Sequence, residues 1–391
     1  MPAWAVVVAI LGAIGAVVTI AWCAWVAVGA FRHRHDPRAA TREEVEQAVE
    51  RAKEELKHDI LEYFNHWRAV PEKSTGQLVA AAPPDRFKLL EEAAKAQREH
   101  RYAEAVAHLR AALTPGLPEG ERAALLTLIG NSLLNLSRLD EAQEAYEKAV
   151  TAAVEAGDEQ ARAAALGNLG NVYRDRGDLD KAEEHHKQAL GIDRRIDNRG
   201  GQAAALGNLG LIYWRRADLE RAEEHHKQAL EIHGRLARRV AQGEDVAHLG
   251  LICHDRGDLE QAQEHYQEAL GLHRGIDNPL GEAQDLNNLG NVYLSRGDLD
   301  KAEEHHKQAL DICRRIDNPL GQANQLRLLG FLAERRGQPE EARRLLKEAL
   351  ALYERMGAGG QGPDKVRAAL RRLEEAGGQE KPPRRPRKRK E

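Results

Sequence analysis

Six glycines at a constant interval of forty residues constrain the fold of this chain more than any other feature. Each lies in a leucine-rich segment that is followed by a segment rich in Ala and Glu; the six are Gly130, Gly170, Gly210, Gly250, Gly290 and Gly330. A fixed period of this size is typical of a stack of similar units, in which each unit contacts its neighbours. The pattern therefore favours a function located on a surface over one located in a central catalytic pocket.

Composition supports a helical stack. Aromatic residues make up 4% of the chain and charged residues 31%, which suits long helices that pack through Leu, Ala and other small residues. The three cysteines, Cys23, Cys253 and Cys313, are odd in number and far apart, so a disulfide framework is not expected. We expect an all-α chain with one continuous array, whatever the domain count that 391 residues would otherwise allow.

The unit that begins at Leu166 contains two predicted helices. Leu166, Gly170 and Tyr173 share one face of the first helix, Gly177 supplies the left-handed residue that ends it, and Asp178 caps the second. In the second helix the buried stripe is formed by Leu179, Ala182, His186 and Ala189. The same frame recurs at residues 206–230, 246–270, 286–310 and 326–350, and more loosely at 89–113 and 126–150, which gives seven units.

This pattern resembles the tetratricopeptide repeat (TPR) family, whose units carry a small residue and an aromatic in the first helix and an Ala-x3-aromatic-x2-Ala run in the second. The resemblance covers residues 87–350 and implies a right-handed superhelix, or α-solenoid. The period is six residues longer than the usual thirty-four, and the extra residues lie around the connections, where Asn278-Pro279 and Asn318-Pro319 predict helix starts. The longer units are similar to those of Pins/LGN-type adaptors and kinesin light chains, which bind extended peptides in a concave groove.

In TPR arrays the first helix of each unit lines the concave face, and seven Asn residues are predicted to lie there. They are Asn131, Asn168, Asn171, Asn208, Asn287, Asn288 and Asn291. An amide carries a donor and an acceptor, so it can pair with an extended peptide backbone of any sequence. Alternatively, these side chains bond across neighbouring repeats or to water. Leu211, Trp214 and Leu251 would add an apolar stretch to the groove, and Lys is missing from the positions that form a carboxylate clamp in some family members.

No residue pattern predicts catalysis, a cofactor or a metal site. The adjacent pairs His185-His186, His225-His226 and His305-His306 diverge around a helix, and the second of each occupies the family's aromatic core position. The segment from Gly357 to Gly362 matches G-x-G-x-x-G, but no predicted strand precedes it, so we expect a flexible break. The sequence predicts a protein that is not an enzyme.

Residues 1–31 contain no charged side chain and are long enough to cross a bilayer as a helix. Arg32, Arg34 and Arg38 lie in the basic flank at 32–40 and place the rest of the chain in the cytoplasm. A cleaved signal peptide is the alternative for the apolar run, and an export route would place the array on the opposite side, in the periplasm.

An amphipathic helix is predicted at 41–70, where Thr41 and Glu44 form a capping box. It is either a weak dimeric coiled-coil stalk, which would make residues 1–70 a homodimer contact, or a helix that lies back on the first repeat. A linker is predicted at 71–86, because this segment has no periodicity and contains Pro83-Pro84.

Beyond the array, a capping helix is predicted at 363–376 and a basic disordered tail at 377–391. The tail cations are Lys381, Arg384, Arg385, Arg387, Lys388, Arg389 and Lys390. They are expected to contact anionic lipid or nucleic acid, or only to keep the chain soluble. The overall prediction is a single-pass membrane scaffold whose cytoplasmic TPR array binds partner proteins. A periplasmic assembly or chaperone-like factor and a nucleic-acid-associated regulator are the alternatives.

Overall fold

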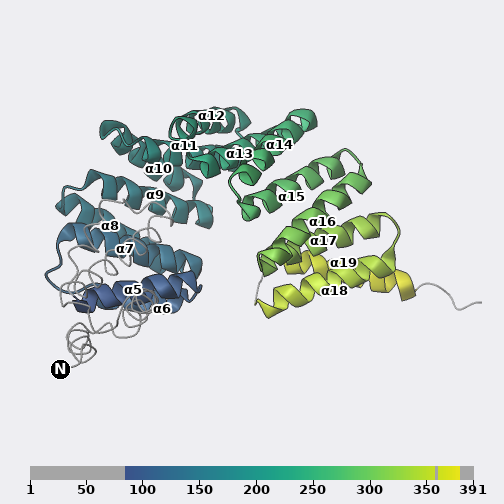
Figure 1. Ribbon diagram of the computed structural model, residues 1–391, viewed down its shortest axis with the longest axis horizontal. Helices are drawn as coiled ribbons and strands as arrows, with labels where there is room; N and C mark the ends of the chain where they lie inside the picture. The colour runs from purple at the N-terminus through teal and green to yellow at the C-terminus, as the bar shows by residue number, and fades with distance from the viewer. Residues whose placement is uncertain (1–83, 357–359, 379–391) are drawn as a thin grey trace, which may run out of the picture. The chain divides into compact units, whose positions relative to one another are not determined.

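The computed structural model describes residues 84–356 and 360–378, and within them every regular element is a helix. Figure 1 labels these fifteen helices α5 to α19. The predicted membrane span, basic flank and juxtamembrane helix lie outside the described residues, as do all but the last three residues of the linker and the tail beyond residue 378. Among the described residues, no helix is long and apolar enough to cross a membrane.

The helices form seven consecutive pairs and one additional helix. The pairs are α5 (Pro84–Arg98) with α6 (Tyr102–Ala112), α7 (Glu119–Asn135) with α8 (Leu139–Glu155), α9 (Glu159–Arg176) with α10 (Leu179–Arg195), α11 (Arg199–Arg215) with α12 (Leu219–Arg235), α13 (Arg239–Arg256) with α14 (Leu259–Gly275), α15 (Pro279–Ser295) with α16 (Leu299–Arg315), and α17 (Pro319–Arg335) with α18 (Pro339–Arg355). The additional helix, α19 (Gln361–Gly378), packs on α18 and contains the predicted capping segment.

The helix boundaries follow from local capping chemistry. Asp178 caps α10 by accepting a hydrogen bond from the backbone N–H of Lys181. Asn278 caps α15 in the same way, with Pro279 in the first turn. Gly177 ends α9 with φ +83°, in the left-handed region. These predicted caps are confirmed.

The chain divides into two compact units, Met1–Ile212 (unit 1) and Tyr213–Glu391 (unit 2), and the boundary falls inside α11. The largest core of unit 1 includes Leu109, Leu128 and Tyr146, which are fully or almost fully buried. Unit 2 has a core around Tyr266 and Leu289 and another around Leu346 and Leu370, the second of which includes residues of α19.

The marker glycines permit close contact between the two helices of a pair. A Cβ atom added at Gly130 would lie 2.6 Å from the ring of Tyr146, and one added at Gly290 would lie 2.7 Å from the ring of His306. Both distances are well inside van der Waals contact, so a methyl group cannot be accommodated without movement. The predicted role of the glycines as small packing residues is confirmed at these positions.

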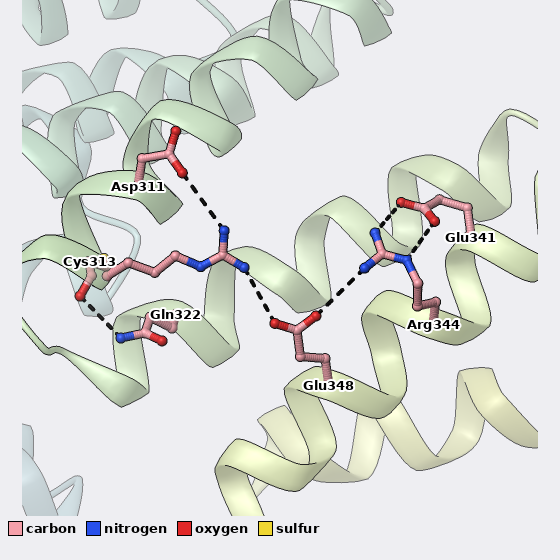
Figure 2. A network of polar contacts seen from close by, with 7 residues as sticks. Asp311, Cys313, Gln322, Glu341, Arg344 and Glu348 are labelled. Atoms are coloured by element: carbon pink, nitrogen blue, oxygen red, sulfur yellow. Dashed lines mark hydrogen bonds and ion pairs between the residues drawn. The ribbon is translucent and has the colours of Figure 1, made fainter.

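The exposed surface of the second helices carries ion pairs that bridge successive repeats. Glu348 of α18, labelled in Figure 2 beside Arg344 of the same helix, lies 3.9 Å from Arg344 and 3.4 Å from the guanidinium of Arg314 on α16. A nearby hydrogen bond from the Gln322 side chain to the Cys313 carbonyl, 3.2 Å long, links α17 to α16. The ion pairs are about half exposed, so their expected contribution to stability is small.

Candidate protein-binding groove

A groove of about 740 Å³ lies in unit 2 along three first helices, α13, α15 and α17. Its lining repeats from helix to helix, because the same positions of successive units face it. The recurring lining positions are Glu244, His248 and Leu251 on α13, Gln284, Asn288 and Asn291 on α15, and Asn324 and Leu328 on α17. This volume is in the range of known ligand sites, and its extension over three repeats suits an extended ligand.

Amide side chains dominate the polar part of this groove. Gln325 donates through Nε2 to Asn287 Oδ1 at 3.1 Å, and Asn287 donates through Nδ2 to Asn288 Oδ1 at 3.3 Å. This series of hydrogen bonds begins in the core: Nδ1 of the buried His306 lies 3.0 Å from Gln325 Oε1. This relay holds the Asn288 side chain in one orientation at the groove surface.

Apolar side chains lie beside the amides. Leu280 and Leu320 line the groove although they are 46% and 50% exposed. Val240, at the equivalent position of the preceding unit, is 48% exposed. Covering an exposed leucine with a ligand stabilises the complex by roughly 25 cal/mol per Å² of apolar area removed from water. The groove therefore combines backbone-pairing amides with places for apolar side chains.

The charged groups in the lining differ between its helices. On α13, desolvation by the surrounding side chains raises the pKa of Glu244 although the residue is exposed, and the neighbouring Asp245 raises it further. Between α14 and α15, Nδ1 of His273 lies 2.6 Å from Asp285 Oδ2, and this hydrogen bond raises the pKa of His273. On α17 the guanidinium of Arg327 lies over the ring of Phe331, 5.6 Å from its centroid. A ligand thus meets the exposed Glu244 on α13 and a cation on α17, whereas Asp285 on α15 is buried against His273.

The structure brings together part of the predicted groove set. Asn287, Asn288, Asn291 and Leu251 all line the groove of unit 2. Asn287 also bonds to Gln325 of the following unit, as the alternative for these amides foresaw. Trp214 belongs to unit 2 as well, but its Nε1 donates to Asp255 Oδ2 at 2.6 Å and it does not line this groove.

The remaining predicted residues belong to unit 1. Asn131 is 1% exposed and accepts a hydrogen bond from the Tyr146 hydroxyl at 2.6 Å, so its amide is committed to the core. Asn168 is also buried, and Asn208 accepts a hydrogen bond from Arg174. Asn171 and Leu211 are half-buried on their first helices.

Sequence reasoning missed several lining residues. Gln284 and Asn324 lie one turn before Asn288 and Leu328 on their helices, and Leu280 and Leu320 directly follow the helix-starting prolines. These residues were predictable from the helical register, because they lie on the same face as Asn288 and Asn291 at a spacing of one turn.

The two histidines of each adjacent pair diverge around their helix. The second histidine of each pair is buried, with His186, His226 and His306 at most 1% exposed, as predicted. However, the following helix brings Asp245 and His248 next to His226, a grouping that no comparison within a pair could reveal.

These repeated helix pairs define an α-solenoid. The model of the tetratricopeptide repeat family matches residues 121–195, 161–235, 241–315 and 282–355, which together cover more than half of the chain. The chain therefore belongs to the TPR family. No curated protein sequence matches it.

Solved structures with this fold share little sequence with the chain. The apo form of RapI is 13% identical, with a TM-score of 0.57 over 70% of this chain and 99% of RapI. A Rap protein complexed with competence and sporulation factor is 14% identical, with a TM-score of 0.55 over 84% of this chain and 100% of that protein. A TPR protein from Parabacteroides merdae ATCC 43184 is 18% identical, with a TM-score of 0.52 over 75% and 100%. These similarities establish the fold alone.

Proposed function

We propose that this chain is a scaffold that binds an extended segment of a partner protein in the groove of unit 2. The observation that carries the proposal is the repeated lining of that groove: amides and an exposed leucine lie on both α15 and α17, and the equivalent face of α13 adds His248 and Leu251. An extended segment repeats its backbone groups and side chains along its length, so a surface that repeats from unit to unit matches it. The Rap protein complexed with competence and sporulation factor has the same fold and supports the proposal.

The lining also suggests which segments bind. Apolar side chains of the partner cover Leu280 and Leu320, and the amide of Asn288 pairs with the partner backbone. Acidic partner residues are favoured near Arg327 and disfavoured near Glu244. The charges therefore set the direction of the segment, while the amides tolerate many sequences.

Membrane attachment forms a second part of the proposal. Residues 1–31 anchor the chain as one span, the cytoplasmic array recruits partners to the bilayer, and the tail cations from Lys381 to Lys390 contact anionic lipid. Phosphatase and cytoplasmic reporter fusions at the carboxy terminus test the orientation. Phosphatase activity without cytoplasmic signal would replace this arrangement by the periplasmic assembly factor.

The groove is tested by quantitative pull-down from the native cell extract. The groove variant combines Leu280→Ser, Leu320→Ser and Asn291→Ala, and we expect it to lose the partners that the wild-type chain recovers. The matched control combines Val154→Ser, Ile196→Ser and Leu236→Ser, which alter exposed apolar side chains outside the groove lining. Equal partner recovery by wild type and groove variant, with circular dichroism unchanged, rules out the groove as the binding surface.

A further inference from the structure

A buried cluster of three histidines and one aspartate joins α12 to α13 in unit 2. His226 and His233 lie two turns apart on α12, and Asp245 and His248 lie one turn apart on α13. His226 and Asp245 are 1% and 4% exposed, and His248 is half-buried. The placing of four potential metal-ligating side chains at one helix junction requires a physical explanation, because buried polar groups are costly.

The donor atoms of three of these residues converge. Nδ1 of His226 lies 3.1 Å from Asp245 Oδ1, the rings of His226 and His248 stack with centroids 4.7 Å apart, and the ligand atoms of all three residues lie within 4.8 Å of one another. Two ligands on a tetrahedral zinc ion with bonds of about 2.0–2.1 Å are about 3.3 Å apart. The first pair is close to this spacing, and the ligand atom of His248 lies within 4.8 Å of both.

The fourth residue holds the aspartate in place. Nδ1 of His233 lies 2.8 Å from Asp245 Oδ2, the oxygen that does not face His226. A ligating carboxylate is commonly oriented by such an outer hydrogen bond. The cluster thus has three converging ligands and one supporting partner.

The equivalent junctions of the same chain do not carry this set. At the positions of His226, Asp245 and His248, the five other junctions between helix pairs have Val106, Leu125 and Leu128; Tyr146, Ala165 and Asn168; His186, Ala205 and Asn208; Tyr266, Asp285 and Asn288; and His306, Gln325 and Leu328. The repeat frame therefore folds without three donors at this place. Among the described residues, these three form the one group of such donors that converges closely enough for a metal ion.

We propose that His226, Asp245 and His248 bind one divalent transition-metal ion, with zinc as the principal candidate. Imidazole and carboxylate groups are common zinc ligands, and zinc accepts three protein ligands with water in the fourth position. The bound ion links α12 to α13, and His248 places the site at the edge of the groove. The proposal is independent of any partner in that groove.

The test is titration of the metal-free, full-length chain in detergent with zinc chloride, followed by calorimetry. We expect one strongly bound equivalent, and a loss of affinity of tenfold or more in His248→Asn. That variant carries the residue that three other junctions have at this position, so it is expected to fold. The matched control, His306→Tyr, alters a buried histidine of another junction and is expected to bind zinc as the wild type does.

Cobalt chloride provides a second readout that does not depend on any variant. Four-coordinate cobalt bound at the site gives an intense visible absorption, whereas six-coordinate cobalt at surface histidines gives a weak one. Absence of the intense band in the wild-type chain overturns the proposal, as does equal zinc affinity in His248→Asn and wild type. A further variant, His305→Asn, changes the more exposed histidine of another adjacent pair. If zinc binding is lost in His305→Asn as well as in His248→Asn, the metal is bound nonspecifically by surface histidines and the proposed site is contradicted.

Discussion

Two junctions, one in each unit, share the helix-pair frame but are filled with different chemistry. In unit 1 the junction between α8 and α9 is apolar: Ala123, Ala152, Ala153 and Ala161 form one buried cluster. Ala165, which follows on α9, is buried as well. The buried contacts of this cluster are made by alanine methyl groups.

The corresponding junction of unit 2, between α14 and α15, is polar. His273 stands where unit 1 has Ala153, and it pairs with Asp285 where unit 1 has Ala165. Gly243 and Gly281 replace the two flanking alanines, and a Cβ atom added to them would lie 2.4 and 2.6 Å from the His273 ring. The His273 side chain therefore fits because positions 243 and 281 carry glycine instead of alanine.

This difference indicates what the polar junction is for. A buried ion pair is often no more stabilising than apolar residues of similar volume, so the apolar junction of unit 1 would serve stability equally well. His273 and Asp285 line the groove, whereas their counterparts at the α8–α9 junction are Ala153 and Ala165. We infer that the α14–α15 junction retains its polar pair for the groove rather than for stability.

The largest predicted effect comes from breaking one polar pair. Asp285→Ala removes the partner of the buried His273 and is expected to lower the free energy of unfolding by about 3 kcal/mol. Because Asp285 raises the pKa of His273, the contribution of that group is present below its unfolded-state pKa and is lost as pH rises through the raised value. Urea unfolding at several pH values, followed by circular dichroism, measures the loss of unfolding free energy and its pH dependence.

A transplant of the unit 1 junction sharpens this prediction. Gly243→Ala, Gly281→Ala, His273→Ala and Asp285→Ala together place alanine at the positions that hold Ala123, Ala161, Ala153 and Ala165 in unit 1, and most of the lost stability is expected to return. If the fourfold variant is less stable than Asp285→Ala alone, the two junctions are not interchangeable and the comparison fails.

Next in size are substitutions of the marker glycines, which the two units share. Gly130→Ala in unit 1 and Gly290→Ala in unit 2 are each expected to lower unfolding free energy by about 2 kcal/mol, because the added methyl group overlaps a buried ring. The controls are Gly191→Ala and Gly271→Ala, helix positions with no atom within 4 Å, where a gain of about 0.5–1 kcal/mol is expected. Similar losses in both units confirm that the frame is common, and a neutral result at Gly130 contradicts it.

A smaller effect depends on pH. Burial lowers the pKa of His186 to about 3 and that of His306 to about 4, from 6.5. Below pH 6.5 the unfolded chain therefore binds more protons than the folded one. The free energy of unfolding consequently decreases as the pH is lowered. Each group is expected to remove about 1 kcal/mol between pH 7 and pH 5.5.

The variant His186→Tyr tests this pH dependence in unit 1. Tyrosine occupies this position in the preceding repeat, where the Tyr146 hydroxyl donates to Asn131. The equivalent Asn171 has a buried Oδ1 that accepts no hydrogen bond from the described residues. We expect the variant to lose about half of the acid sensitivity in denaturant titrations, with the exposed His100→Asn as the control. An unchanged pH profile would show that His186 is not the group responsible.

The smallest predicted effect concerns the surface pairs of Figure 2. Glu348→Ala removes the partner of Arg314 and Arg344 and is expected to change unfolding free energy by about 0.5 kcal/mol or less. The contrast with Asp285→Ala separates exposed from buried pairs. A loss above about 1.5 kcal/mol in thermal or urea unfolding would mean that this network stabilises the stack directly.

The sequence predicted those parts of the fold that depend on local chemistry. Asp178, Asn278 and Gly177 act through groups within a few residues, and Gly130 acts through a fixed register, so periodicity and capping rules were sufficient. The burial of the second histidine in each pair followed from the same register.

The groove was predictable only in part. Asn288 and Asn291 face it as their register requires, but Asn131 lies in the core because the Tyr146 hydroxyl needs a buried acceptor. The grouping of His226 with Asp245 and His248 joins residues about twenty positions apart on two helices. Aligning the seven repeats column by column shows that this junction alone combines those residue types, and only the packing shows that they meet.

Site-specific photo-crosslinking in living cells tests the central claim most directly. A photoreactive amino acid placed at Asn291 faces the groove, and one placed at the exposed Gln308 of α16 does not. The account predicts partner crosslinks from Asn291 that disappear when Leu280→Ser and Leu320→Ser are introduced, and none to the same partner from Gln308. Crosslinks to that partner from Gln308 and not from Asn291 would contradict binding in the groove of unit 2.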